Sequence, residues 1–484
     1  MILLLLTLLT TTPTFAKEYI FTGDQNVVAI PLEDSLDDFA LRVEAIKRAK
    51  VSIDVFTYMQ TLDDKLGEEY IQALEDAIRR GVKVRYAMDW LPNTAALGRK
   101  ARAPAERLLR EAYTSESCSL EVQCITPFSK IMAGYTPTDN FHEKILNIDM
   151  GTEDEIAWVS GRNNNDFAVR DLDFAVVLRR VNKKKNSAIS LLGKVFEDHW
   201  KETLEMQDPE VKSAGIATKR KKPKEPLLLG TTKLYPGLKE CLFSGSEIQG
   251  VTFKPHTMSV TTNSFFEQLK KNSWFTWIRD DKMKSDNIDT VVRGIQRAKV
   301  IRMSLMSTFW PAPLKEALLN AVSRGVKIEI FTNSSETDKV AVPGGLAYLY
   351  SSRDLSDLMK KVNTYNNGDC EVKTELKINV LNAKKIQEDA SGFWKRIKFI
   401  HQKMIITDQE IFMGSDNYNQ ASMVKNSEMQ VRFTGKDALS FFHCHFDEIS
   451  KLFTPLTENE IMKAKQESLG PLNRIMIRAL KPFF

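Results

Sequence analysis

Two stretches of the chain show the same order of apolar and polar positions. In the first, a helix ending near residues 46–50 precedes a β-branched and aromatic run at 51–59, and apolar residues at helical spacing follow at 66–80. Gly81 can end this second helix, and residues 82–88 form the next predicted strand. This order of helix, strand, helix and strand favours crossover connections and a sheet with helices on its faces.

The same order returns between residues 286 and 333. Residues 295–300 repeat the pattern of 46–51, and Gly325 takes the place of Gly81. The offset between the copies grows from 244 residues at these glycines to 259 at the histidine motifs described next. We therefore predict one duplicated unit of about 200 residues, with a longer insertion in the second copy, within residues 334–396.

Each copy carries a histidine two residues before a lysine, inside a run of β-formers. These are His142 and Lys144 in the first copy and His401 and Lys403 in the second. Side chains two residues apart on a strand share a face, so each pair can present an imidazole and an ammonium group to an anion such as a phosphate. Two of the six histidines occupy equivalent places, which makes a coincidence between two core strands the weaker interpretation.

Further polar residues follow both motifs at matching positions. Asp149 and Asp408 have the opposite strand parity, so we expect them to be structural and to lie behind the site. A turn follows each strand, and a carboxylate comes ten or eleven residues after the asparagine of that turn. The predicted site residues of these segments are Asn163, Asp173, Gly414, Ser415, Asn417 and Glu428.

If the two motif strands meet, the pocket can bind a phosphodiester without a divalent ion. Two ammonium groups and the neutral donors Asn163, Asn417 and Ser415 would meet the phosphoryl oxygens. One imidazole would attack phosphorus and the other would protonate the leaving alkoxide. Asp173 and Glu428 are expected to orient the imidazoles, with Glu428 beside the second histidine. The residues alone do not distinguish which histidine is the nucleophile.

Composition and charge are ordinary for a soluble globular protein of two or three domains, with 484 residues, 43% hydrophobic and 27% charged. The net charge of +5 permits an anionic partner without requiring nucleic acid. The sequence shows no pattern that predicts an extended basic and aromatic groove, which argues against nucleic-acid binding. The five cysteines have no Cys-x-x-Cys spacing and predict no metal, although Cys118 and Cys124 are close enough for a small disulfide loop.

The segments outside the copies suggest export and a membrane surface. Residues 1–16 resemble a secretory signal, with an interfacial anchor as the alternative, so we expect an exported, periplasmic protein peripheral to a membrane. Residues 469–484 form a predicted basic amphipathic helix, suited either to an anionic membrane or to packing on its own domain. The predicted repeats are 17–207 and 286–468, and 208–285 is a predicted linker or insert.

The motifs at His142–Asp149 and His401–Asp408 resemble the HxKxxxxD signature of the phospholipase D superfamily, and the turn at 414–417 resembles its GSxN element. The flanking sequences at 160–163 and 170–173 are similar to segments of bacterial cardiolipin synthases. The resemblance implies an α/β fold: two phospholipase D-like α/β/α sandwich repeats packed into one pseudo-two-fold body with a shared active site.

The resemblance also implies a function. It implies ping-pong phosphatidyl transfer through a phosphohistidine on a phospholipid substrate, without cofactor or metal, with His142 as nucleophile and His401 as acid and base. The expected product is a cardiolipin-type phospholipid. A phospholipase D hydrolase releasing phosphatidic acid, a metal-independent nuclease of the same superfamily, and a non-catalytic binding module are the alternatives. The pattern specifies neither the acceptor nor an oligomeric state.

Overall fold

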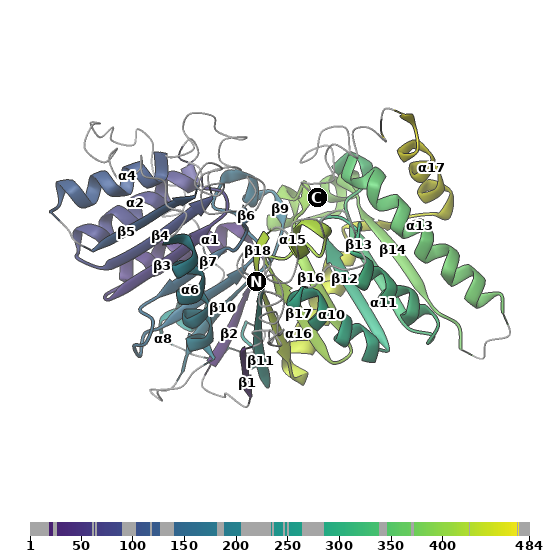
Figure 1. Cartoon of the computed structure of the whole chain (residues 1–484), viewed down its shortest axis with the longest axis horizontal. Helices are drawn as coiled ribbons and strands as arrows, with labels where there is room; N and C mark the ends of the chain where they lie inside the picture. Colours follow the sequence, from purple (N-terminus) through teal and green to yellow (C-terminus); the bar gives the residue numbers. More distant parts are fainter. Residues whose placement is uncertain are drawn as a thin grey trace, which may run out of the picture.

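The computed structural model describes most of both repeats. The described residues are 19–22, 27–60, 62, 65–89, 103–116, 119–125, 140–181, 188–204, 234, 237–244, 247–248, 251–263, 285–337, 346–368, 372–424, 426–471 and 473. They form two sheets that lie side by side, the first repeat at the left and the second at the right of Figure 1.

The first sheet has seven strands. In spatial order they are β2 (Val27–Leu32), β10 (Ala175–Arg180), β8 (Ile156–Ser160), β7 (Ile145–Ile148), β3 (Ser52–Thr57), β4 (Lys83–Asp89) and β5 (Leu120–Ile125). The pairings from β2 to β3 are antiparallel and those from β3 to β5 are parallel. Most of these strands are buried along their whole length, as expected for a sheet covered on both faces.

The second sheet repeats this order and adds strands at its edges. Its path is β1 (Tyr19–Thr22), β11 (Thr257–Asn263), β18 (Asn426–Thr434), β17 (Glu410–Gly414), β16 (Lys403–Thr407), β12 (Val300–Leu305), β13 (Lys327–Thr332), β14 (Leu376–Leu381) and β19 (Phe453–Pro455). The seven strands from β11 to β14 match β2 to β5 in order and in every strand direction. The predicted duplication and fold class are therefore confirmed.

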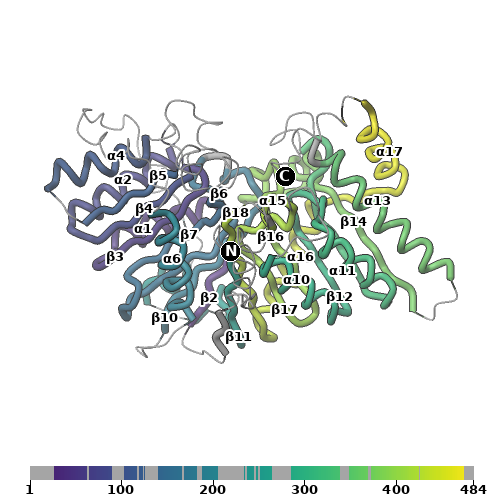
Figure 2. The backbone as a smooth tube through the Cα atoms, in the orientation of Figure 1, coloured from purple at the N-terminus to yellow at the C-terminus, as the bar shows by residue number. Residues whose placement is uncertain are grey.

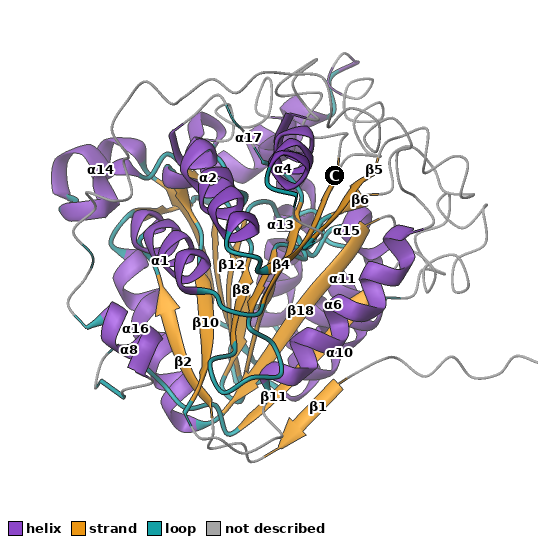
Figure 3. Ribbon diagram, turned by 90° about the vertical axis from the view of Figure 1, so that its left-hand side faces the viewer, coloured by secondary structure: helices purple, strands orange, loops and turns teal. Residues whose placement is uncertain are grey.

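Helices cover the outer face of each sheet. On the first sheet these are α1 (Ser35–Arg48), α2 (Lys65–Arg79) and α4 (Ala103–Thr114), which lie in front of the strands in Figure 3. On the second they are α10 (Asp286–Arg297), α11 (Ala312–Val322), α13 (Leu346–Asn366) and α17 (Glu458–Ser468). Gly81 and Gly325 follow equivalent helices with φ of 82° and 71°, the left-handed conformation in which glycine is favoured.

The inner faces of the two sheets share a third apolar core. It includes α6 (Ile189–Leu204) from the first repeat and its counterpart α16 (Lys436–Ser450) from the second, together with apolar residues from strands of both sheets. Figure 2 shows the two halves of the chain meeting along this junction. The shorter helices are α8 (Leu238–Ser244), α14 (Ala383–Asp389) and α15 (Gln420–Val424).

The boundary predicted for the second repeat is wrong. The segment 208–285, expected to be a linker or insert, contains β11, which occupies the place of β2 in the second sheet. Its sequence, TMSVTTN, is rich in small polar residues, and therefore lacks an apolar signal although six of its seven residues are buried. The second repeat thus begins before residue 257, and α13 accounts for the longer insertion predicted at 334–396.

Other predictions from the sequence fall on segments that the structure does not describe. Residues 1–16 and most of 469–484 lie outside the described residues, as does the side chain of Cys118. Export and a peripheral membrane location stay predictions. Among the described helices, none has both the length and the apolar character needed to cross a bilayer.

Candidate active site

A two-residue strand of the first repeat pairs with the second sheet at the junction. β6 (Asn140–Phe141) runs parallel to β18, with Phe141 opposite Ser427. The backbone N–H of His142 then donates to the Ser427 carbonyl at 3.0 Å. Because Glu428 is the next residue, a carboxylate of the second repeat lies beside the histidine of the first.

The mirror-image arrangement occurs on the other side of the junction. β15 (Phe399–Ile400) runs parallel to β9 (Asp171–Leu172), and the N–H of His401 donates to the Leu172 carbonyl at 2.9 Å. Asp173 follows and lies beside His401. The expectation that Glu428 lies beside His401 is therefore wrong: each imidazole is paired with the carboxylate of the other repeat.

The His142 ring is held through Nδ1, and among the described residues no partner contacts its Nε2. Its Nδ1 lies 2.9 Å from a Glu428 carboxylate oxygen and 3.0 Å from the Ser415 carbonyl oxygen. A carbonyl only accepts hydrogen bonds, so Nδ1 carries the proton and Nε2 keeps its lone pair. Burial, followed by the Lys144 and Lys403 ammonium groups, holds the pKa of His142 well below its usual range. The ring is thus neutral and suited to nucleophilic attack.

The His401 ring has a shorter contact with its carboxylate. Its Nδ1 lies 2.7 Å from Asp173 Oδ2. Burial opposes ionisation of Asp173, but Lys403 and the His401 hydrogen bond outweigh it and lower the pKa of this carboxyl. Asp173 is therefore ionised and accepts the Nδ1–H. Burial and Lys403 lower the pKa of His401 to about 4, so this imidazole is also neutral at neutral pH in the empty site.

The Glu428 carboxyl group is fully buried. It accepts hydrogen bonds from Ser415 Oγ at 2.5 Å, Ser422 Oγ at 2.8 Å and Asn426 Nδ2 at 3.0 Å. Burial raises the pKa of Glu428 to about 7, although Lys144 and these hydrogen bonds act in the opposite direction. Ser415, expected to offer its hydroxyl to a phosphate, is fully buried and instead holds this carboxyl.

The two motif lysines lie near each other where the two repeats meet, each beside the histidine of its own motif. Lys144 Nζ donates to the His142 carbonyl at 2.5 Å, and Lys403 Nζ donates to the His401 carbonyl at 2.6 Å and lies 3.2 Å from His401 Nε2. Burial lowers the pKa of both ammonium groups, against the opposing effect of nearby carboxylates. Two desolvated cations side by side favour a bound anion, because it would restore part of the lost solvation.

The asparagines of the two turns occupy equivalent, half-buried positions. Within the described part of the chain, neither Asn163 Oδ1 nor Asn417 Oδ1 has a hydrogen-bond partner, although both atoms are buried. A buried amide usually satisfies its polar atoms. These unpaired oxygens accept hydrogen bonds, as phosphoryl oxygens do, so contact between a phosphate and the Nδ2 groups of the two asparagines stays a prediction.

Close packing requires glycine in both turns: Gly161 lies against Asp173 and the second turn, and Gly414 lies against β18 of its own repeat. A Cβ on Gly161 would lie 2.9 Å from Asp173 Oδ1 and 3.3 Å from the Gly414 carbonyl oxygen. A Cβ on Gly414 would lie 2.1 Å from the Met429 carbonyl oxygen. A larger residue at either position would displace the strand that carries a site carboxylate.

Tyr58, just after β3, belongs to the site although the sequence analysis did not single it out. Its ring packs edge-on against the His142 ring at 4.5 Å between centroids, and Lys144 Nζ lies 4.9 Å from its centroid. A tyrosine at the end of an apolar strand carries no motif signal, since such residues usually cover the core.

Three further charged residues surround Asp173 and the second turn. Arg162 is fully buried and donates to Asp38 Oδ2 at 3.0 Å and to the Asp173 carbonyl at 2.5 Å, which fixes the strand that carries Asp173. Burial and the neighbouring Asp173 raise the pKa of Asp171 to about 8. Burial and a nearby carboxyl raise the pKa of Asp416 to about 7. Both Arg162 and Asp416 stand inside the turns that the sequence marks.

The motif aspartates lie at the far ends of their strands, away from the histidines. The Asp149 carboxylate accepts three successive backbone N–H groups at 2.7 to 3.1 Å, from Lys50, Val51 and Ser52. Asp408 accepts two, at 2.8 and 3.3 Å, from Lys299 and Val300. Each aspartate therefore joins the motif strand to the loop that precedes the neighbouring strand, as the strand parity predicts.

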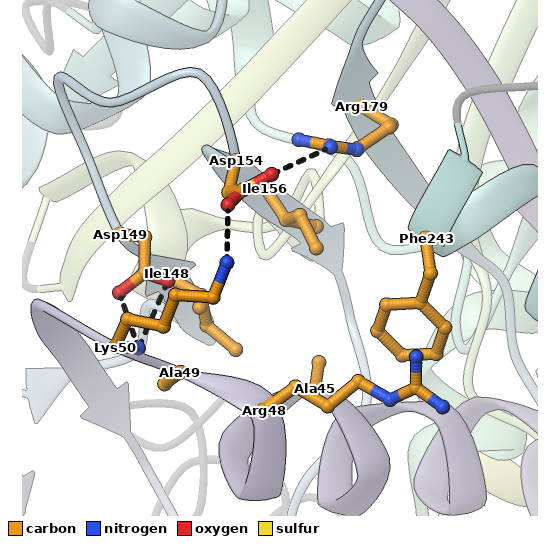
Figure 4. Close-up of a pocket in the computed structure, with 10 residues that line it drawn as sticks. All are labelled: Ala45, Arg48, Ala49, Lys50, Ile148, Asp149, Asp154, Ile156, Arg179 and Phe243. Atoms are coloured by element: carbon orange, nitrogen blue, oxygen red, sulfur yellow. Dashed lines mark hydrogen bonds and ion pairs between the residues drawn. The ribbon is translucent and has the colours of Figure 1, made fainter.

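Figure 4 shows Asp149 beside a cavity whose cations already have carboxylate partners. Lys50 Nζ lies 2.9 Å from Asp154 Oδ2, and Arg179 lies 3.3 Å from Asp154 Oδ1. The cavity is thus lined by a compensated ion network, and we assign it to the scaffold.

Replacing Asp149 with alanine should lower the free energy of unfolding by about 2–3 kcal/mol, because three backbone N–H groups lose one acceptor. Urea denaturation of the purified variant measures this loss. Glu448→Ala is the control: its pair with Lys451 is exposed on both sides and should contribute little. Loss of turnover in a fully stable Asp149→Ala protein would instead place Asp149 in the chemistry.

Part of the chain matches a known family, and the whole chain resembles a solved structure. Residues 291–450 match the family described as "Cardiolipin synthase, PLD-like domain". The chain resembles the crystal structure of a phosphatidylserine synthase from Haemophilus influenzae Rd KW20, at 12% identity over 97% of both chains, with a TM-score of 0.63. No curated protein matches the chain significantly.

Two partial structural matches are weaker. A polyphosphate kinase from Porphyromonas gingivalis matches 90% of this chain and 50% of its own, at 13% identity and a TM-score of 0.41. The phospholipase D family member Nuc from Salmonella typhimurium matches 35% of this chain and 89% of its own, at 21% identity and a TM-score of 0.24. The family match lies within the second repeat, and the similarity to the phosphatidylserine synthase structure shows a shared fold over the whole chain; in these respects the chain resembles the phospholipase D superfamily.

Proposed function

We propose that the protein is a phosphatidyltransferase that forms cardiolipin-type phospholipids in two steps through a phosphohistidine. The observation that carries the proposal is the His142 ring, whose Nδ1 is held by Glu428 and the Ser415 carbonyl. Among the described residues its Nε2 has no hydrogen-bond partner, and the ammonium groups of Lys144 and Lys403 act on the ring. The family match to the cardiolipin synthase domain supports phospholipid as the substrate class.

In the first step, His142 Nε2 attacks phosphorus and the bond from phosphorus to the leaving oxygen breaks. His401 gives that oxygen a proton. The anionic phosphodiester between the two rings raises the pKa of His401 above its value in the empty site, so that the proton is available. Lys144 and Lys403, with the amides of Asn163 and Asn417, hold the phosphoryl oxygens.

In the second step, an acceptor alcohol gives its proton to His401 and its oxygen attacks phosphorus. The bond between phosphorus and His142 breaks and the ring is restored. With phosphatidylglycerol as both donor and acceptor, the products are one cardiolipin and one glycerol. Transfer to serine is the second candidate, because the similar whole-chain structure is that of a phosphatidylserine synthase.

Incubation of the purified protein with phosphatidylglycerol, followed by lipid mass spectrometry, tests the proposal. We expect cardiolipin and glycerol in equal amounts. Phosphatidic acid alone would identify a hydrolase, and phosphatidylserine formed only when serine is added would favour the second candidate. Cleavage of plasmid DNA without metal, lost in His142→Ala, would instead support a nuclease.

A further inference from the structure

The middle residue of each His-x-Lys motif takes no part in the proposed chemistry, yet it is fully buried. Glu143 and Gln402 both have an exposed fraction of 0%. Each contacts a histidine of an inner helix, His199 on α6 or His445 on α16. Four of the six histidines of the chain thus form two equivalent sets, one in each repeat.

In the first repeat the contact is an ion pair. Glu143 Oε1 lies 2.5 Å from His199 Nδ1, and Ser427 Oγ donates to the same carboxylate oxygen. Burial disfavours the charged imidazole, but the Glu143 carboxylate outweighs it and raises the pKa of His199. The Glu143 carboxylate therefore favours the protonated, imidazolium form of His199.

In the second repeat an amide takes the place of the carboxylate. Ser304 Oγ donates to Gln402 Oε1 at 2.5 Å, and Gln402 Nε2 lies 2.8 Å from His445 Nε2. An amide nitrogen only donates, so His445 Nε2 is the acceptor and Nδ1 carries the proton. That N–H points to Glu33 Oε1 at 2.6 Å. In the second repeat the carboxylate of Glu33 thus contacts the far nitrogen of the His445 ring. In the first repeat the carboxylate belongs to the motif residue Glu143 itself.

These contacts hold segments that have no strand pairing of their own. Residues 142–144 lie between β6 and β7, and residues 401–402 lie between β15 and β16. The Glu143 carboxylate favours the protonated forms of His142 and Lys144 and acts against the effect of burial. Gln402 carries no charge and supplies no such effect.

We propose that Glu143–His199 and Gln402–His445 are positioning pairs that anchor the two reactive segments, and that a carboxylate in one and an amide in the other make the two reactive histidines unequal. The proposal deepens the proposed function, since the inequality bears on which histidine is the nucleophile. Charged groups also act on each ring: Glu428, Lys144 and Lys403 on His142; Asp173, Lys144 and Lys403 on His401; and Asp198 and Glu202 on His199.

Nuclear magnetic resonance of histidine rings labelled with ¹³C and ¹⁵N tests the pairs without turnover, and six histidines give few enough signals to resolve. At pH 7 the wild-type protein should show a charged His199 and a neutral His445 protonated at Nδ1. Glu143→Gln should make His199 neutral at pH 7. Gln402→Glu should raise the pKa of His401 by about 0.5–1 unit, because it adds the charge that the first repeat already has.

Thermal unfolding at pH 7 establishes that each variant is folded. The same charge state for His199 and His445 in the wild type would overturn the proposal, and so would an unchanged His401 titration in folded Gln402→Glu. A protein that shows these titrations but converts no phospholipid would reject the proposed function and leave the positioning pairs in place.

Discussion

Replacing His142 with alanine should abolish covalent capture of the phosphatidyl group and lower kcat/KM by at least about 10⁴-fold, because the variant lacks the Nε2 that we propose attacks phosphorus. His401→Ala should still capture the group but release it slowly, so the covalent species should accumulate. Incubation with a phospholipid radiolabelled in its phosphate, followed by alkaline gel electrophoresis, measures the label retained on the protein.

His256→Ala is the control for this experiment, since His256 is exposed and lies outside the site. Its labelling and turnover should match those of the wild type. Label retained by His142→Ala and absent from His401→Ala would reverse the two roles. Equal loss of label in both variants would mean that proton donation by His401 is indispensable for capture.

Replacing Asp173 with asparagine should lower kcat by about 10²- to 10⁴-fold with little change in KM, because the amide cannot accept the His401 Nδ1–H in the same way and stabilise the imidazolium form. Glu428→Gln should have a smaller effect. The Ser415 carbonyl still accepts the His142 Nδ1–H in that variant, and the carboxyl that is replaced already has a pKa of about 7.

Rapid-quench measurement of capture and release separates the two variants. Glu428→Gln should slow capture through His142, whereas Asp173→Asn should slow the steps in which His401 moves a proton. The opposite assignment, with Glu428→Gln acting on proton transfer alone, would contradict the crossed pairing. Both variants should unfold at temperatures close to that of the wild type, since each keeps the shape of the side chain.

The parts of the fold that depend on local sequence were predictable. Strands such as β3 and β4 are rich in β-branched and aromatic residues, and the glycines at 81 and 325 end equivalent helices. The two motifs, their turns and their later carboxylates could be found because the same polar pattern occurs in both repeats. The strand parity of Asp149 also predicted a structural role away from the histidines, and its carboxylate does accept backbone N–H groups there.

The parts that depend on contact between the repeats were not predictable. β6 and β9 are two residues long, too short to show any periodicity, yet they decide which carboxylate meets which histidine. β11 is hidden by its serine and threonine residues. Arg162 reads as an exposed turn residue, and only the fold reveals that it is fully buried against Asp38 and the strand of Asp173.

The short strand pairs β6–β18 and β15–β9 each join a strand of one repeat to a strand of the other. Parting the repeats would remove the carboxylate from both imidazoles in a single movement, so an opened molecule has neither an oriented nucleophile nor an oriented acid. Such a molecule cannot capture a phosphatidyl group, and it cannot assist water in removing one that is already bound. Under the proposed function, an intact junction is therefore a condition for both steps of the transfer.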